Sequence, residues 1–223
     1  MVNMKILVAP QEFKGSISAL SVAEAAKVGV IRVFPKAEVV LCPVADGGDG
    51  TLETLVEVSG GEVRTCNVRN PIGETITAQW GAMGDGVTAV IEMARTSGLA
   101  LLSLDERDPL NASTFGLGQA ILEALNEGFR NFIVGIGGSA TNDAGAGMAQ
   151  ALGANLLDSE GRSIGSGGAA LANLRSIDVS KMDPRIEGSH FMVACDVSNP
   201  LTGAEGASAV YGPQKGATPA MVA

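Results

Sequence analysis

The stretch VGIGGSATNDAGAGM, residues 134–148, runs from an apolar segment into small and polar residues and then into a helical pattern. It holds five glycines, whereas an ordinary turn needs only one or two. Loops that lead from a strand into a helix expose backbone N–H groups, which favour anions, and open α/β sheets bind their ligands there. We therefore predict a strand at 131–136, a helix ending near residue 152, and a ligand-contacting loop between them.

The N-terminal sequence predicts alternating strands and helices. KILVAP, residues 5–10, is a short apolar run ended by proline, which is typical of a buried strand. A helix is expected from Ser16 or Ser18 to Pro35, followed by a strand at 37–45 and a loop that opens a second helix. This order of elements favours a parallel, doubly wound sheet.

Beyond Gly61, polar and apolar residues alternate between turn signals, which indicates short antiparallel strands. We predict an α/β fold with two domains, residues 1–61 and 62–223. A helix that begins at Thr218 and Pro219, close to the last residue, favours a chain that continues further; a frayed natural end is the alternative. Three further segments are predicted as a helix, a strand and a loop, respectively: 114–128, 190–197 and 211–217.

The composition limits the function. Of the 223 residues, 46% are hydrophobic and 17% are charged, so the chain can bury a sizeable core. A formal net charge of −9 disfavours nucleic acid as a partner, because its phosphates would be repelled. No run of 18 apolar residues occurs, so we expect no membrane-spanning helix. A small anionic ligand would therefore need local donors.

The cysteines and the single histidine exclude several chemistries. Cys42, Cys66 and Cys195 form no C-x-x-C pair, and the start of the chain has no signal-peptide pattern. We therefore expect reduced, mostly buried thiols in a cytoplasmic protein. The single histidine, His190, excludes a His-rich metal site and leaves little room for a Ser-His-Asp triad.

Two loops in the first domain carry residues suited to binding or catalysis. APQEFKGS, residues 9–16, offers the cation Lys14 and the hydroxyl of Ser16 ahead of a helix, although a solvated lysine would give the same pattern. VADGGDGT, residues 44–51, would hold Mg²⁺ or a substrate hydroxyl, or would simply cap a helix. The candidates in this second loop are Asp46, Gly47, Gly48, Asp49 and Thr51.

Two more candidate loops lie in the second domain. The stretch 134–148 would turn its N–H and O–H donors toward one point, and Gly145 and Gly147 would let its helix approach closely. The fourth loop combines CDVSNPL with GPQKGA, and neither the dinucleotide fingerprint nor the P-loop signature occurs anywhere. The residues alone predict an α/β protein that binds a small, phosphorylated ligand. The candidates in these two loops are Gly137, Gly138, Ser139, Thr141, Asn142, Asp143, Asp196, Asn199 and Lys215.

Taken together and in this order, the motifs resemble the bacterial type I glycerate kinases. The similarity is carried by APQEFKGSISA, PVADGGDGT, GIGGSATNDAGAGMAQALGA, ACDVSNPL and GPQKGA, with IEMARTSGL and RDPLNASTFGLGQ between them. It implies a flavodoxin-like parallel-sheet domain and a mixed-sheet domain inserted into it, here truncated at the C-terminus. It also implies ATP- and Mg²⁺-dependent phosphorylation of D-glycerate to 2-phosphoglycerate. The partners expected from it are D-glycerate and ATP. A homodimer is the assembly to be considered.

Four positions depart from the pattern of that family. The family has Asp-Ser where this chain has Gln11-Glu12, Glu where it has Asp49, and Gly where it has Ala144. Gln11 removes a carboxylate from a loop that is expected to face the substrate. If that acid takes part in catalysis, this copy would be impaired or altered.

Phosphoryl transfer requires placement, neutralisation of phosphate charge and an acceptor for the hydroxyl proton. We assign Lys14 and Lys215 as the cations beside the carboxylate or phosphoryl group. Asp46 and Asp196 are the candidates for general base and for Mg²⁺ ligand, with either order open, and the other candidates would clamp glycerate or phosphate. The alternative is a catalytically inactive module that binds a small molecule or nucleotide; the absent fingerprint disfavours an α/β dehydrogenase.

Overall fold

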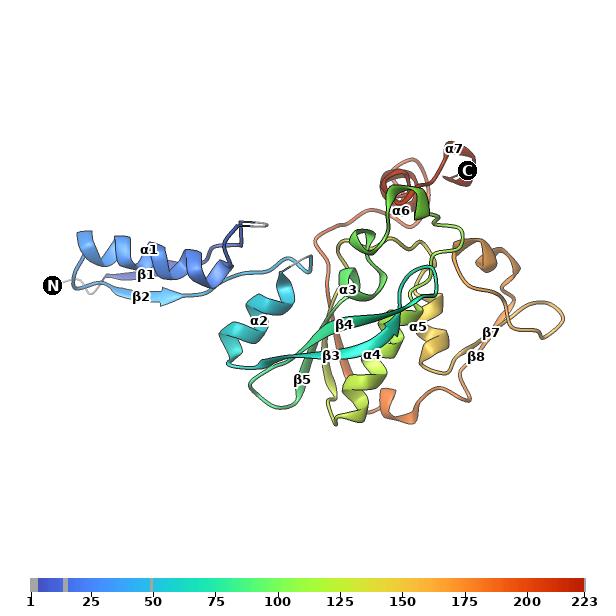
Figure 1. Cartoon of the computed structure of the whole chain (residues 1–223), viewed down its shortest axis with the longest axis horizontal. Helices are drawn as coiled ribbons and strands as arrows, with labels where there is room; N and C mark the ends of the chain where they lie inside the picture. Colours follow the sequence, from blue (N-terminus) through green and yellow to red (C-terminus); the bar gives the residue numbers. More distant parts are fainter. Residues whose placement is uncertain (1–3, 14–15, 49, 223) are drawn as a thin grey trace.

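The N-terminal unit consists of two parallel strands joined by a helix, and it lies at one end of the molecule (Figure 1). The helix begins after Ser18, whose hydroxyl accepts a hydrogen bond from the amide of Ser21 at 3.3 Å. This confirms the second of the two predicted N-caps. The computed structural model describes residues 4–13, 16–48 and 50–222. The elements of the unit are β1 (Lys5–Val8), α1 (Ala19–Val33) and β2 (Glu38–Leu41).

The rest of the described chain is built on a five-stranded mixed sheet with the strand order β3-β4-β5-β6-β9. The first three strands are antiparallel neighbours, as the alternating sequence predicts, whereas β5 pairs with β6 and β6 with β9 in parallel. Parallel strands end at the same edge, so the loops that follow β6 and β9 lie close together. The strands are β3 (Glu62–Arg69), β4 (Thr75–Ala82), β5 (Thr88–Glu92), β6 (Asn131–Gly135) and β9 (His190–Ala194).

Helices pack on both faces of this sheet. Successive residues of a strand point to opposite faces. In β5, Ala89 and Ile91 belong to the hydrophobic core that includes α4, whereas Val90 packs in the cluster formed with α2. Trp80 and Phe129 meet edge to face in the larger core, with ring centroids 5.4 Å apart. The helices are α2 (Thr51–Ser59), α3 (Met93–Ser97), α4 (Phe115–Asn126) and α5 (Ala146–Ala151).

The C-terminal part of the chain forms a hairpin and two short helices. The loop predicted at 211–217 is wrong in part, because α6 ends at Tyr211 and a 3-10 turn follows at Pro213–Lys215. Helix α6 and the 3-10 turn carry too few residues for a periodic apolar pattern, so the sequence did not indicate these two elements. The helix start at Pro219 is confirmed. The elements are β7 (Asn155–Leu157), β8 (Ser176–Asp178), α6 (Ala207–Tyr211) and α7 (Pro219–Val222).

The domain boundary near residue 61 stays a prediction. Helix α2 precedes that boundary in the chain, but it packs through Leu52 and Val56 against Val90 of the five-stranded sheet. The hydrophobic contacts of α2 therefore belong to the larger sheet, and the chain leaves the β1–β2 unit before this helix begins. No helix in the described ranges is long and apolar enough to cross a membrane.

The thiols differ from expectation in their exposure. All three cysteines are free, but Cys42 and Cys195 are exposed and Cys66 is half-buried. The prediction of mostly buried thiols is therefore wrong. Cys42 directly follows β2 and Cys195 directly follows β9, and strand ends of this kind open onto the surface rather than into the core.

A buried carboxylate fixes the start of α2. Glu92, at the end of β5, is 1% exposed, and its Oε1 accepts a hydrogen bond from the amide of Leu52 at 2.8 Å. Its Oε2 pairs with Nε of Arg95 at 2.6 Å, and Arg95 also contacts Glu53 in the first turn of α2. Burial raises the pKa of Glu92, against the opposing effects of the Leu52 and Arg95 hydrogen bonds.

Substitution of Glu92 separates its two contributions. Glu92→Ala leaves the Leu52 amide without its acceptor and Arg95 without its buried partner, so the free energy of unfolding should fall by about 3 kcal/mol. Glu92→Gln keeps an acceptor and removes a buried charge, so the change should stay below about 1 kcal/mol. Urea unfolding followed by the fluorescence of Trp80, the single tryptophan, measures both. Equal losses in the two variants would contradict this account.

Ala144, just before α5, has a left-handed backbone with φ of 50°. It is the only non-glycine residue with a positive φ in the part of the chain that the structure describes. This conformation costs an L-residue about 1–2 kcal/mol, a strain that glycine does not share.

We therefore expect Ala144→Gly to raise the free energy of unfolding by about 0.5–1 kcal/mol, after the greater entropy of the unfolded glycine is deducted. The matched control is Ala149→Gly, in the helical backbone of α5, which should lower it by about 1 kcal/mol or more. Urea unfolding of both variants decides the matter. A destabilised Ala144→Gly protein would show that this backbone is not left-handed.

Candidate functional site

A cavity of about 350 Å³ lies where the loops after β6 and β9 meet the loop before α2. We call it the site cavity; its volume lies within the range of small-molecule sites. The segment 207–215 closes one side of it. Three of the four predicted loops thus meet at one place. The predicted site residues that line it are Asp46, Gly48, Gly137, Gly138, Ser139, Asp196, Asn199 and Lys215.

Glycines bring two of these loops into contact. The amide of Gly137 donates a hydrogen bond to the carbonyl of Gly47 at 3.1 Å. A Cβ atom at Gly135 would lie 2.5 Å from the carbonyl oxygen of Gly47, and a Cβ at Gly47 would lie 2.5 Å from that of Ala194. Both positions therefore require glycine, and part of the glycine content of 134–148 joins the loops to each other.

The loop after β6 is also held from its other side. Leu99 donates its amide to the carbonyl of Gly138, and Ala140 donates its amide to that of Ser97, both at 2.9 Å. These bonds keep the loop open toward the cavity, where backbone N–H groups would bind an anion. The amides of Gly138 and Ser139, two residues that line the cavity, and the amide of Thr141 have no acceptor within the described part of the chain.

Lys215 places a buried positive charge at the cavity. Its side chain is 8% exposed, and its Nζ donates to Oγ of Ser139 at 2.9 Å and to the carbonyl of Thr141 at 2.6 Å. Burial lowers the pKa of Lys215, while the charge of Asp143 acts in the opposite direction. No carboxylate among the described residues forms a salt bridge with it. The charge therefore remains available to an anionic ligand.

Two carboxylates line the same cavity, and they differ in their surroundings. Oδ2 of Asp46 accepts a hydrogen bond from Nε2 of Gln11 at 2.6 Å, and its Oδ1 accepts one from the amide of Gly48 at 2.9 Å. Asp196 is exposed. The described residues contain no cluster of three or more metal-binding side chains. Two carboxylates together with the phosphate oxygens of a substrate are nonetheless a donor set that suits Mg²⁺.

Sequence reasoning missed some residues that line the cavity, and it missed the hydrogen-bond partner of Gln11. The hydroxyl of Tyr211 donates to Oδ1 of Asn199 at 2.7 Å and so orients a predicted residue. Tyr211, Cys195 and Gln214 line the cavity beside predicted residues, and their place in CDVSNPL and YGPQKG is the signal that could have found them. Gln11, noted only as a lost carboxylate, donates to Asp46.

Four predicted residues do not line the cavity and instead support it. Oγ1 of Thr51 is buried and accepts the amide of Gly47 at 3.0 Å. Asp143, which is 1% exposed, accepts the amide of Thr114 at 2.8 Å and that of Gly147 at 3.1 Å, so it caps α5. Gly47 itself makes the loop contact described above, and Thr141 contributes its carbonyl to Lys215.

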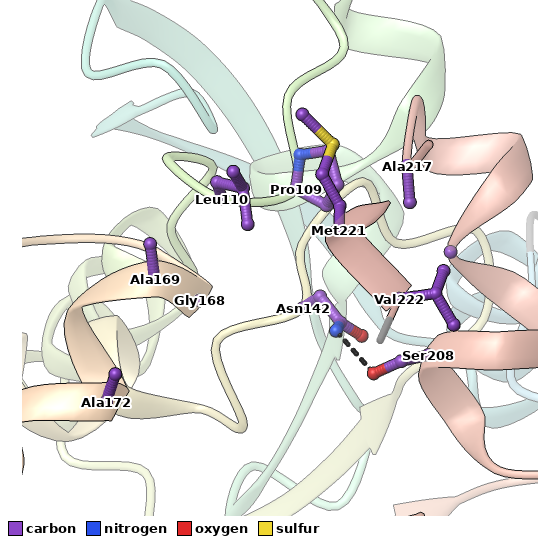
Figure 2. A pocket seen from close by; sticks show the side chains of 11 residues that line it. Pro109, Leu110, Asn142, Gly168, Ala169, Ala172, Ser208, Ala217, Met221 and Val222 are labelled. Atoms are coloured by element: carbon purple, nitrogen blue, oxygen red, sulfur yellow. Dashed lines mark hydrogen bonds between the residues drawn. The ribbon is translucent and has the colours of Figure 1, made fainter. Parts of the chain in front are cut away.

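Asn142 lines a second cavity, of about 230 Å³ (Figure 2). Its Nδ2 donates to Oγ of Ser208 at 2.9 Å. Ser208 faces this second cavity, whereas Ala207 of the same helix lines the site cavity, so α6 separates the two. Ser16 is exposed and lines neither cavity. Lys14 and Asp49 lie outside the described residues, so their placement stays a prediction.

The chain matches known proteins over nearly its whole length. Glycerate kinase of Bacillus subtilis is 55% identical over 219 residues, which are 98% of this chain and 57% of the relative. Glycerate 2-kinase of Escherichia coli is 52% identical over 219 residues, 98% of this chain and 58% of the relative. A crystal structure from Salmonella typhimurium LT2, assigned as glycerate kinase 2, has a TM-score of 0.91 at 50% identity and covers 99% of this chain and 59% of that one.

This chain therefore spans 57–58% of the length of these two curated relatives. The α/β architecture expected from the sequence is confirmed by the two parallel strands, the mixed sheet and the similarity to the Salmonella structure. A family model described as the glycerate kinase family matches residues 6–223. The resemblance inferred from the motifs is thereby confirmed, and this chain belongs to the glycerate kinase family.

Proposed function

We propose that this chain serves the ATP-dependent phosphorylation of D-glycerate at its 2-hydroxyl group, which yields 2-phosphoglycerate. One observation carries the proposal: in a member of the glycerate kinase family, a single cavity brings together a buried lysine without a carboxylate partner and two carboxylates. Relatives named glycerate kinase and glycerate 2-kinase support the substrate. Because the chain spans only part of their length, their activity is extended to it as a proposal.

Lys215 and the neighbouring amides would hold the anionic part of the ligand. The ammonium group already donates to Ser139 and Thr141, so its position is set before a ligand arrives. The free amides of Gly138 and Ser139 lie in the same loop and would supply further donors. In a chain with a net charge of −9, this local group of donors is what would attract a carboxylate or phosphate.

The two aspartates would divide the remaining tasks. Gln11 and Gly48 already hold the two oxygens of Asp46, which suits a group that orients the ligand. Asp196 is exposed at the cavity, and no side chain or amide within the described ranges donates to its carboxylate, so it is placed to accept the proton of the attacking hydroxyl. Asp46 and Asp196 would also hold Mg²⁺, which in phosphoryl transfer neutralises charge on the phosphate oxygens.

Two wider expectations accompany this proposal. Three free thiols support a reducing compartment such as the cytoplasm. A homodimer remains a prediction from the family resemblance.

An assay of ADP release tests the proposal directly. The chain should release ADP from Mg²⁺-ATP only when D-glycerate is present, and Lys215→Met should reduce the turnover by about 10²–10³-fold. Lys181→Met, which removes an exposed lysine away from the cavity, is the matched control and should leave the rate unchanged. Thermal stabilisation by D-glycerate without any ADP release would identify a binding module and contradict phosphoryl transfer.

The affinity for D-glycerate should depend on pH through Lys215. The ammonium form binds the carboxylate, and burial lowers the pKa of Lys215 below that of an ordinary lysine. Affinity should therefore be lost as the pH rises through this lowered pKa, before an ordinary lysine would titrate, and proton uptake should accompany binding there. Calorimetric titrations from about pH 7 to about pH 10 measure both effects. A flat profile over this range would count against Lys215 as the anion ligand.

A further inference from the structure

Lys215 reaches the site cavity from a segment with little structure of its own. It is the last residue of the three-residue turn Pro213–Lys215, which follows Gly212 and is followed by Gly216 with φ of 95°. The bonds of this turn join its own backbone groups: the amides of Lys215 and Ala217 donate to the carbonyl of Gly212 at 2.9 and 3.0 Å, and that of Gly216 donates to Pro213 at 3.1 Å. These local backbone bonds shape the turn but do not hold the buried ammonium group at the cavity, since burial of a charge opposes this arrangement. Contacts from outside the turn must therefore position it.

Arg107 provides such contacts on both sides of Lys215. Its Nη1 donates to the carbonyl of Gln214, the preceding residue, at 3.0 Å. Its own carbonyl oxygen lies against Gly216, the following residue, where an added Cβ would be only 2.4 Å away. The side chain and the backbone of one arginine thus clamp the two neighbours of Lys215.

No ion pair explains why Arg107 lies in this place. It is half-buried, and no carboxylate among the described residues pairs with it. The acidic neighbours are used elsewhere, because Glu106 accepts from Ser103 and Asp108 accepts from the amide of Leu110. Its Nε is buried without a partner in the described structure. A buried N–H without an acceptor destabilises the folded state. Within the described residues, the side-chain hydrogen bond that Arg107 does make is the one to the carbonyl of Gln214.

We propose that Arg107 is a positioning residue, which holds the Pro213–Lys215 turn so that the ammonium group of Lys215 faces the site cavity. The inference rests on the proposed function, in which Lys215 binds the carboxylate or phosphate of the ligand. The motif RDPLNASTFGLGQ, which begins at Arg107, thereby acquires a role in the site.

Two variants and one control test this role. Arg107→Ala removes the donor to Gln214, and Arg107→Lys keeps a charge and a shorter donor. The control is Arg130→Ala, because Arg130 is also half-buried and donates to backbone carbonyls, those of Leu125 and Phe129, away from the cavity. Each protein is used as the full 223-residue chain.

The main readout is the titration of Lys215 by NMR in lysine-labelled protein, with its signal assigned by its loss in Lys215→Arg. In Arg107→Ala, the pKa of Lys215 should rise toward that of an ordinary lysine, because the released side chain becomes hydrated and the lowering by burial is lost. The affinity for D-glycerate should fall about tenfold. Arg107→Lys should lie between Arg107→Ala and the unmodified chain, and Arg130→Ala should match the latter. Other titratable groups near Lys215 enter the same fit: Asp46, Asp143, Cys195, Asp196 and Tyr211.

The titration separates this inference from the proposed function. An unchanged pKa of Lys215 in a folded Arg107→Ala protein would overturn the positioning role, as would an equal change in Arg130→Ala. If the unmodified chain binds no D-glycerate, the proposed function fails, but the titration of Lys215 still decides whether Arg107 positions it. Circular dichroism of each variant establishes that it is folded.

Discussion

The site depends on the direct contact between two glycine backbones. The carbonyl of Gly47 accepts the amide of Gly137, and Gly135 lies against the same carbonyl with no room for a side chain. This contact ties the loop before α2 to the loop after β6, and so brings Asp46 and Ser139 to one cavity. Any side chain at these positions would push the loops apart and separate the carboxylate from the donors.

The second constraint is electrostatic. A chain with a net charge of −9 repels anions, yet its cavity contains a lysine whose charge no described carboxylate neutralises. Burial makes this ammonium costly, which lowers its pKa, and the oxygens of Ser139 and Thr141 offset part of that cost. The charge of Asp143 acts on Lys215, but its carboxylate accepts hydrogen bonds from Thr114 and from the start of α5. The positive charge of Lys215 thus remains for a ligand.

Sequence patterns predicted much of the fold and the loops of the site. Ligand loops follow parallel strands, so the order of the motifs was enough to predict that Asp46, Ser139 and Asp196 meet at one site. Lys215 reaches the same cavity from the turn after α6. The order of the motifs was not enough to sort neighbouring residues within a loop. Thr51 and Asp143 have the chemistry of ligand-binding residues, but hydrogen bonds to Gly47 and Thr114 turn them inward. The direction of a side chain in an irregular loop depends on such distant partners, which periodicity does not reveal.

By itself, the sequence determined the class of fold, the family and the loops that form the site, because strand and helix patterns and long ordered motifs are local properties of the chain. Only the tertiary structure decided that Gln11 holds Asp46, that Asn142 faces a second cavity and that Arg107 contacts the turn of Lys215. Gln11 is 35 residues from Asp46, Asn142 is 66 residues from its partner Ser208, and Arg107 is 107 residues from Gln214. Contacts of that range arise from the packing of the whole chain, so no short stretch of residues encodes them.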